Sequence, residues 1–263
     1  MKKAYVTAIS TDSYLPGVLA LDKNIRDTCK YPLVVLVPHD LSEESYEKMR
    51  RLNIKFVQAD HIETPKELMR ATEEHDWFAH WAKSLFKLRI FDLVEYDKIV
   101  FVDCDMMLME SVDEVFDLPD ISATIGAKDY PGNEHFEDLS SGFMVIEPKK
   151  GLSDNMALLI PEVAAKKNIF GDQDIMQAYF TDWKEKKELV LPDKYNVWFP
   201  HYQFYAKRER VKGVHFLGRK KPWMMNNCDV LREYLRCLFK GNRKGIAVLR
   251  KYRKLLKEVG SNI

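Results

Sequence analysis

The chain has 263 residues, 46% of which are hydrophobic, and this length suits one large α/β domain or two small ones. Its 41 Lys and Arg residues nearly balance its 40 Asp and Glu residues, and the formal net charge of +1 argues against a nucleic-acid-binding protein that works through bulk positive charge. No apolar run reaches the roughly 20 residues that a membrane-spanning helix needs.

The N-terminal part of the chain alternates between strand and helix patterns. Short apolar runs predict strands at residues 5–10, 33–38 and 54–59. Helical spacing of apolar residues predicts a helix over 18–28, and Ser42 followed by two glutamates predicts the start of a second helix. This alternation predicts parallel strands joined by right-handed crossovers.

The same mixture continues along the rest of the chain. Residues 61–82 are polar and aromatic and predict a loop followed by a helix. Residues 84–94 have a stronger helical pattern, with Leu85, Leu88 and Phe91 three positions apart. Further strands are expected at 98–105, 121–128, 141–148 and 211–218, and further helices at 111–119, 171–180 and in the basic C-terminal tail.

The cysteines and the N-terminus bear on the cellular compartment. Cys29, Cys104, Cys228 and Cys237 are widely scattered and have no C-x-x-C spacing, so they predict free thiols rather than a disulfide framework or a zinc site. The segment MKKAYVTAIS lacks the long apolar region and the small-residue cleavage site of a signal peptide. We therefore expect a cytoplasmic protein.

Two acids interrupt an apolar strand in the segment VFVDCDMML, residues 100–108. Burying a carboxylate costs several kcal/mol unless something pairs it. Ligands of open parallel sheets bind beyond the C-terminal ends of the strands, and residues i and i+2 of a strand point to the same side. Asp103 and Asp105 can therefore clamp one divalent cation, although a pair of acids capping the next turn is an equal alternative from this pattern alone.

The chain resembles glycosyltransferase family 8 from Tyr5 to about Trp223, through six segments that stand in the family's order: VTAISTDSYLPGVLAL, LFKLRIFDL, FVDCDMML, SSGFMVI, FGDQDIMQ and HFLGRKKPW. Each segment is weak alone, but the six together are specific. The resemblance implies a single-domain, Rossmann-like nucleotide-diphosphosugar transferase fold of the GT-A type, an α/β fold with a mainly parallel central sheet flanked by helices. We expect residues 1–225 to form the catalytic domain and residues 226–263 a basic helical extension packed on it.

The resemblance implies a retaining transferase that moves glucose or galactose from a UDP-sugar and depends on Mn²⁺, with Mg²⁺ as the alternative ion. A divalent ion that bridges both phosphates would neutralise the charge on the UDP leaving group. The implied ligands are Asp103, Asp105 and His215, a set that suits Mn²⁺ without selecting it uniquely. Taken alone, His215 would more often be a half-buried strand residue.

Other residues are assigned to the diphosphate by the same resemblance. Lys221 would reach it as a point charge, and Gly218 would let the loop backbone approach a phosphate closely. Lys87 matches the donor-binding lysine of the family, and Cys104 belongs to the same donor-binding set. Without the resemblance, either lysine would be interpreted as an ordinary solvated one.

The first loop would hold the uridine through Ala8, Ser10, Thr11 and Tyr14. Tyr14 would stack on the base, and the small residues would contact its edge and the ribose. Val37 would line the base pocket, with packing in the core as an equal alternative. Asp12 stands where the family often has Asn, so its contact with the nucleotide is open.

The donor sugar would lie against two further segments. Ser140, Ser141 and Gly142 replace the family's Asn-Ser-Gly, and the change at Ser140 would alter the sugar preference. Asp172 would orient the sugar hydroxyls, although an Asp there also commonly caps a helix. Gln173 would lie under the ring, and because a neutral amide is a poor nucleophile, the resemblance favours attack by the acceptor on the face from which UDP leaves.

The acceptor stays open between a carbohydrate, a glycolipid, a polyol and a protein. One alternative is glycogenin-like self-glycosylation on Tyr202 or Tyr205, and another is a catalytically silent UDP-sugar-binding module. The aromatic residues around Trp198 form either a platform for sugar rings or a packed lid. The oligomeric state is open, and a dimer is one expectation.

The C-terminal tail combines basic and apolar residues. The basic residues are Arg236, Lys240, Arg243, Lys244, Arg250, Lys251, Arg253, Lys254 and Lys257, and the interleaved apolar ones are Leu238, Phe239, Ile246, Leu249, Leu255 and Leu256. Such a helix can lie on an anionic membrane, which predicts peripheral membrane contact. The alternative is a helix packed on the domain with one solvated face.

Overall fold

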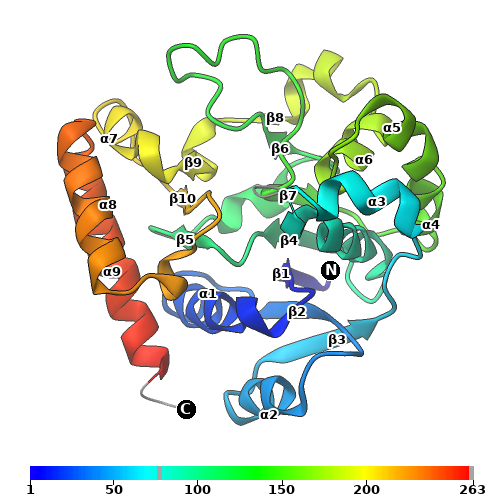
Figure 1. The fold of residues 1–263 in the computed structure, drawn as a ribbon, viewed down its shortest axis with the longest axis horizontal. Coiled ribbons are helices and arrows are strands. Elements are labelled where there is room, and N and C mark those ends of the chain that lie inside the picture. Colours follow the sequence, from blue (N-terminus) through cyan, green and yellow to red (C-terminus); the bar gives the residue numbers. More distant parts are fainter. Residues whose placement is uncertain (76–78, 261–263) are drawn as a thin grey trace.

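A seven-stranded sheet forms the centre of the computed structural model, which describes residues 1–75 and 79–260 (Figure 1). In sheet order the strands are β3 (Lys55–Ala59), β2 (Leu33–Pro38), β1 (Lys3–Ala8), β4 (Lys98–Val102), β7 (Phe143–Ile146), β6 (Ala123–Thr124) and β8 (Val190–Leu191). β7 is antiparallel to both of its neighbours, and the other pairs are parallel. The mainly parallel α/β sheet expected from the sequence is therefore confirmed.

Alternate residues of the strands pack into two separate hydrophobic cores, one on each face of the sheet. Tyr5 and Val35 point to the face that packs against α1 (Leu15–Thr28) and α2 (Glu43–Arg51). On the opposite face, Ala4, Val6, Val34 and Leu36 pack with residues of α3 (Lys66–Glu73), α4 (Leu152–Ala157), α5 (Ile160–Lys166) and α6 (Asp172–Tyr179). Burial on both faces explains why the inner strands β2 and β4 are nearly continuous apolar runs rather than alternating ones.

The helix expected over residues 84–94 is a 3₁₀ helix, η2 (Ala79–Asp92), rather than an α-helix. A 3₁₀ helix has three residues per turn, so Leu85, Leu88 and Phe91 come to lie on one face, and all three are buried. The spacing of three in the sequence was therefore a signal of the tighter helix. The other short 3₁₀ turns are η1 (Asp12–Tyr14), η3 (Asp113–Asp117), η4 (Trp183–Glu185), η5 (Lys187–Leu189), η6 (Asp193–Tyr195), η7 (Phe199–His201) and η8 (Pro222–Met224).

The prediction of a single strand over residues 98–105 is wrong, because the chain leaves the central sheet there and enters a second, three-stranded sheet. β4 ends at Val102, and the chain then turns, with Met106 N donating to Asp103 O at 3.0 Å. The next strand, β5 (Met106–Leu108), leaves the central sheet and pairs with β10 (Gly213–His215), which in turn pairs with β9 (Val197–Trp198). Asp103 and Asp105 therefore lie in a turn between two sheets, not along one strand.

The C-terminal tail forms two helices, α8 (Asn227–Phe239) and α9 (Arg243–Gly260), at the left edge of the view in Figure 1. α9 packs along α1 and beside the short helix α7 (Tyr202–Tyr205). Leu249 and Tyr252 of α9 are fully buried. None of the helices in the described residues is long and apolar enough to cross a membrane. All four cysteines lie in the described part and are free thiols.

Candidate functional site

A cavity of about 500 Å³ opens where β1 and β4 end. Ala8 closes β1, and the turn after β4 contributes Asp103 and Asp105 to the wall. This is the edge at which open α/β sheets bind their ligands, and the volume is in the range of small-molecule sites, about 300–1,000 Å³.

Most residues that the sequence assigns to the donor, the metal and catalysis meet in this cavity. They are Ala8, Ser10, Tyr14, Lys87, Asp103, Cys104, Asp105, Ser140, Ser141, Gly142, Asp172, Gln173, His215, Gly218 and Lys221. In the described part of the chain, Thr11 and Val37 lie outside the lining. The Thr11 hydroxyl pairs with Ser13 Oγ at 2.9 Å, whereas Val37 is fully buried in the core, as its alternative interpretation expected.

Asp12 binds the start of α2 rather than the cavity. Its Oδ1 accepts hydrogen bonds from Ser42 N at 3.1 Å and from the hydroxyls of Ser42 and Ser45. The Ser45 hydrogen bond contributes most to the lowered pKa of Asp12. Ser42 also caps α2 by accepting from Ser45 N, which confirms the helix start expected from the sequence. Asp12 thus ties the first loop of the cavity to α2.

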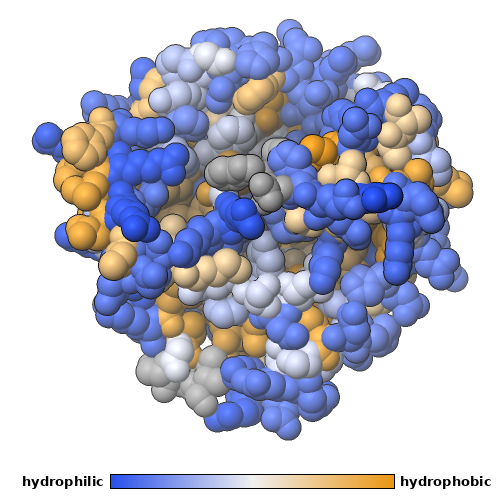
Figure 2. Space-filling view, in the orientation of Figure 1, coloured by the Kyte–Doolittle hydropathy of each residue, from blue (hydrophilic) through white to orange (hydrophobic). Residues whose placement is uncertain are grey.

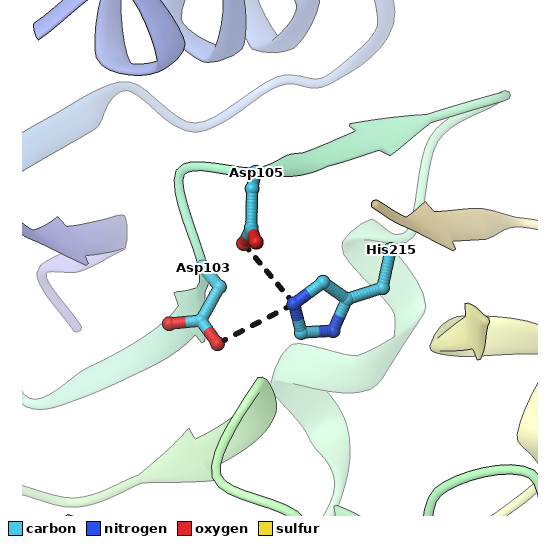
Figure 3. Close-up of side chains that lie close together, drawn as sticks. All are labelled: Asp103, Asp105 and His215. Atoms are coloured by element: carbon cyan, nitrogen blue, oxygen red, sulfur yellow. Dashed lines mark ion pairs between the residues drawn. The ribbon is translucent and has the colours of Figure 1, made fainter. Parts of the chain in front are cut away.

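Asp103, Asp105 and His215 converge on one point (Figure 3). One ligand atom from each lies within 4.8 Å of the others, and His215 Nε2 is 3.0 Å from Asp105 Oδ1 and 3.7 Å from Asp103 Oδ2. Two carboxylates and one imidazole nitrogen are the donor set that a divalent transition metal accepts. The residues present therefore fit a divalent ion.

The backbone makes room for this cluster at Gly142. Asp103 N donates to Gly142 O at 3.0 Å, so the segment just before β7 lies directly against the turn. A Cβ on Gly142 would lie 2.8 Å from His215 Cε1 and 3.2 Å from Asp103 Oδ2. Only glycine leaves the space that the imidazole and the carboxylate occupy.

Asn196, which the sequence did not assign to the site, holds the far side of the His215 ring. Its Oδ1 is 2.9 Å from His215 Nδ1, and its Nδ2 donates to Thr124 Oγ1 at 3.0 Å and to Ser140 Oγ at 3.3 Å. Asn196 is fully buried and lies just before β9, two strands away from β5 in the smaller sheet. No local pattern around a single buried Asn could have indicated this contact.

Two lysines offset the negative charge of the cavity. Lys221 Nζ is 2.5 Å from Asp105 Oδ2, and Lys87 Nζ is 2.8 Å from Asp103 Oδ1 and 3.2 Å from Asp172 Oδ2. Burial favours the neutral acid, but the charges of His215 and Lys221 outweigh it and lower the pKa of Asp105. Burial, with the neighbouring Asp105 carboxylate, raises the pKa of Asp103 despite Lys87. When two carboxylates share one site, their pKa values are expected to move apart, as they do here.

The start of α6 brings Asp172 and Gln173 to the opposite wall. Asp172 Oδ2 accepts from Ser141 Oγ at 2.8 Å, and Gln173 Oε1 accepts from Ser141 N at 3.1 Å. Asp172 N donates to Ser84 Oγ of η2 at 3.1 Å. Both side chains are therefore held in place by the segment that precedes β7. The capping role that the sequence left open for Asp172 belongs to Asp174, whose side chain accepts from Gly171 N.

Several lining residues were not predicted as site residues. They are Ile9, His80, Trp81, Lys83, Ser84, Phe86, Gly171, Asp174, Leu217 and Arg219. Most stand next to a predicted residue along the chain, and the turns of η2 bring its members beside Lys87. Trp198 also lines the cavity, whereas its neighbours Phe199 and Tyr205 are buried, so the aromatic segment supplies both wall and packing.

The fold and the position of the cavity place the protein in the class of GT-A-type glycosyltransferase folds. The crystal structure of the galactosyltransferase LgtC with donor and acceptor sugar analogues aligns with a TM-score of 0.60 at 18% identity, covering 92% of this chain and 96% of LgtC. The apo glycosyltransferase GlyE of Streptococcus pneumoniae TIGR4 aligns with a TM-score of 0.57 at 18% identity, covering 99% of this chain and 64% of GlyE.

Residues 5–227 match Glycosyl transferase family 8, and the chain belongs to this family. It is 27% identical over 226 residues to a putative UDP-glucuronate:xylan alpha-glucuronosyltransferase 4 of Arabidopsis thaliana, covering 85% of this chain and 37% of the plant protein. It is 26% identical over 234 residues to human glycogenin-1, covering 84% of this chain and 62% of glycogenin-1. The chain thus spans less than two thirds of the length of these relatives.

Proposed function

We propose that the protein is a retaining glycosyltransferase that moves a hexose, glucose or galactose, from a UDP-sugar to an acceptor hydroxyl with the help of Mn²⁺ or Mg²⁺. The observation that carries the proposal is the convergence of Asp103, Asp105 and His215 at the wall of a ligand-sized cavity. Family membership and the GT-A fold support the same conclusion.

The proposed metal ligands are Asp103, Asp105 and His215. When bound, the ion would supply positive charge that offsets the charge developing on the UDP leaving group. Lys221 lies beside Asp105 and lines the cavity, so it would offer a second positive charge to the diphosphate. Gly218, in the left-handed region with φ at 116°, leaves its loop open on the cavity side for a phosphate.

The nucleoside is proposed to lie against the first loop, beside Ala8, Ser10 and Tyr14. The Tyr14 ring meets Trp223 edge to face at 5.9 Å, and Trp223 Nε1 donates to Ser13 O at 3.0 Å. These contacts fix the loop that would hold the uracil base. Tyr14 is half-buried, so its remaining surface is available to a planar ring.

The anomeric carbon is proposed to lie between Asp172 and Gln173 on one side and the metal site on the other. Asp172 is held by both Lys87 and Ser141, which suits a residue that orients sugar hydroxyls and opposes one that must attack carbon as a free nucleophile. Gln173, whose Oε1 accepts from Ser141 N, would stabilise positive charge on the ring. We therefore favour attack by the acceptor on the face from which UDP departs.

Self-glycosylation is the second candidate. Tyr205 is 1% exposed and donates its hydroxyl to Asp193 at 2.5 Å, so it could act as an acceptor only after leaving the core. Tyr202 is half-buried and is the better candidate of the two. Because neither tyrosine is freely exposed, transfer to a separate acceptor is the first proposal.

We also propose that the protein contacts a membrane peripherally through α8 and α9.

A UDP-release assay tests the proposed function. The protein would be incubated with UDP-glucose, UDP-galactose and UDP-glucuronate, each with Mn²⁺, with Mg²⁺ or with a chelator, over a panel of sugar, polyol and lipid-linked acceptors. We expect ion-dependent release of UDP with a hexose donor and a product whose anomeric configuration by NMR equals that of the donor. An inverted product would overturn the retaining mechanism, and the absence of both UDP binding and UDP release would favour a different function.

Intact mass spectrometry of the same incubations separates the two candidates. Added hexose units on the protein that disappear in Tyr202→Phe would support self-glycosylation. An unchanged mass beside a glycosylated small acceptor would support the first proposal.

A further inference from the structure

The outward face of α8 carries an apolar stripe that nothing in the described chain covers. Leu231, Leu235, Leu238 and Phe239 are 58%, 44%, 48% and 88% exposed, and their spacing of four, three and one residues places them on one side of the helix. The opposite side, with Val230 and Cys237, is buried. Figure 2 shows the stripe as orange atoms at the left edge of the molecule, over α8.

The charges around this stripe are mostly positive. Residues 227–260 hold ten Lys and Arg against three Asp and Glu, a net charge of +7 in a chain whose total is +1. The three acids are each paired: Asp229 with Lys220, Glu233 with Arg236 and Glu258 with Lys254. Arg232 and Arg236 follow Leu231 and Leu235 by one residue, about 100° around the helix, so they flank the stripe.

The α9 helix contributes charge rather than apolar surface. Leu249 and Tyr252 are buried against the domain, and Ile246, Leu255 and Leu256 are partly buried, so the apolar residues that the sequence placed on a membrane face largely belong to the core. Its exposed charged side chains are all basic: Arg243, Lys244, Arg250, Lys251, Lys254 and Lys257. The packed-helix alternative therefore describes α9, and the free apolar face belongs to α8.

We propose that the α8 stripe inserts into the surface of an anionic lipid bilayer while the basic residues of α8 and α9 contact the headgroups. An apolar stripe flanked by Lys and Arg is the pattern of a helix that lies in a membrane interface. Charge complementarity selects this occupant, because the same +7 surface would repel a second copy of itself. This inference deepens the membrane contact proposed above and does not depend on glycosyl transfer.

Vesicle co-sedimentation of the full chain tests it. We expect binding to vesicles of phosphatidylcholine with a third of phosphatidylglycerol, and little binding to phosphatidylcholine alone. The triple variant Leu235→Gln, Leu238→Gln, Phe239→Gln should bind the mixed vesicles about tenfold more weakly. Leu158→Gln is the matched control, because Leu158 is 77% exposed but lies far along the chain, after α4, and it should bind as the parent protein does.

The charge contribution is tested in the same way. The double variant Arg232→Gln, Arg236→Gln should bind the mixed vesicles more weakly, and its binding should depend less on salt concentration. The control double variant Lys184→Gln, Lys187→Gln removes two exposed lysines elsewhere and should bind as the parent does. Equal binding of the stripe variant and the parent would overturn the proposal. So would a concentration-dependent dimer that the stripe substitutions abolish without any effect on vesicles. Because UDP release in solution should be unchanged in the stripe variant, failure here is distinguishable from failure of the proposed function.

A second inference concerns Asn196, which is fully buried beside His215. We infer that Asn196 is the positioning residue of the proposed metal site. Its Nδ2 is used by Thr124 and Ser140, so its Oδ1 is left to accept a hydrogen bond, and the partner at 2.9 Å is His215 Nδ1. Because an amide oxygen can only accept, Nδ1 is the donor in this pair, and the ring is held with Nε2 toward Asp103 and Asp105, as the nitrogen that would ligate a cation.

The test compares Asn196→Leu, which removes the acceptor, with Thr124→Val, which removes a different partner of the same Asn196 side chain. Manganese binding in the presence of UDP, followed by the electron paramagnetic resonance signal of free Mn²⁺, should be 10–100-fold weaker in Asn196→Leu and nearly unchanged in Thr124→Val. Nitrogen NMR of histidine in the metal-free protein should show a hydrogen-bonded Nδ1 proton on His215 in the parent only. The same Nδ1 hydrogen-bond signal and the same Mn²⁺ affinity in a folded Asn196→Leu would overturn the inference.

Discussion

The Lys221 ammonium lies 2.5 Å from Asp105 Oδ2, and both side chains are 8% exposed. Removing one partner of an ion pair so well shielded from solvent leaves the other charge buried and uncompensated, which destabilises the fold. The same carboxylate is a proposed metal ligand, so the lysine and a bound cation would share it. The cavity is therefore built so that stability and ligand binding depend on one side chain.

Replacing Asp105 by Ala should abolish UDP release and also destabilise the protein. The substitution leaves Lys221 buried without its partner, which costs about 3–5 kcal/mol. Urea unfolding would measure this change. The double variant Asp105→Ala, Lys221→Met should recover most of the stability and none of the activity. Wild-type turnover in the single variant would contradict the assignment of Asp105 to the metal.

Replacing Lys87 by Met should lower stability by a similar amount, about 3–5 kcal/mol, because the Asp103 and Asp172 carboxylates lose their shared cation. Lys83→Met is the matched control, since Lys83 is exposed on the same helix, η2, and its loss should change the free energy of unfolding by less than about 0.5 kcal/mol. Equal effects of the two substitutions would show that Lys87 is only a surface lysine.

Replacing Gly142 by Ala should disrupt the metal site without unfolding the chain. The new methyl group would lie 2.8 Å from His215 Cε1, so the imidazole must move away from the carboxylates. We expect Mn²⁺ affinity in the presence of UDP to fall at least about tenfold. Gly260→Ala, with no neighbour within 4 Å of the added Cβ, should bind as the parent does.

Binding of Mn²⁺ with UDP should raise the melting temperature by roughly 5–10 °C at ligand concentrations a hundred times the dissociation constant. Differential scanning fluorimetry with UDP alone, Mn²⁺ alone and both together would measure it. Asp103→Asn should remove the extra shift that the two ligands give together. A full shift in that variant would place the ion elsewhere.

Asp172→Asn and Gln173→Ala should each reduce kcat about a hundredfold while the proposed donor contacts remain. Near-normal transfer in both variants would show that neither residue acts at the anomeric carbon. Rapid quenching followed by intact mass spectrometry should detect no glycosyl adduct on Asp172. An adduct there would replace same-face attack by a covalent intermediate.

Features that depend on short-range patterns could be predicted from the residues alone. Apolar runs identified β1 and β2, because strands covered on both faces need apolar residues at nearly every position, and a shorter apolar run identified the edge strand β3. Ser42 identified the start of α2 through its capping chemistry. The six ordered segments identified the family, and with it most residues that line the cavity.

Contacts between distant segments could not be predicted from the residues and became clear from the fold. The turn at Asp103, the change of sheet at β5 and the pairing of β5 with β10 together bring His215 to residues more than a hundred positions away. Asn196 and the free face of α8 could not be predicted, because burial and exposure depend on what the rest of the chain packs against each residue. Local sequence specifies periodicity and caps, whereas the path of the whole chain specifies which side chains meet.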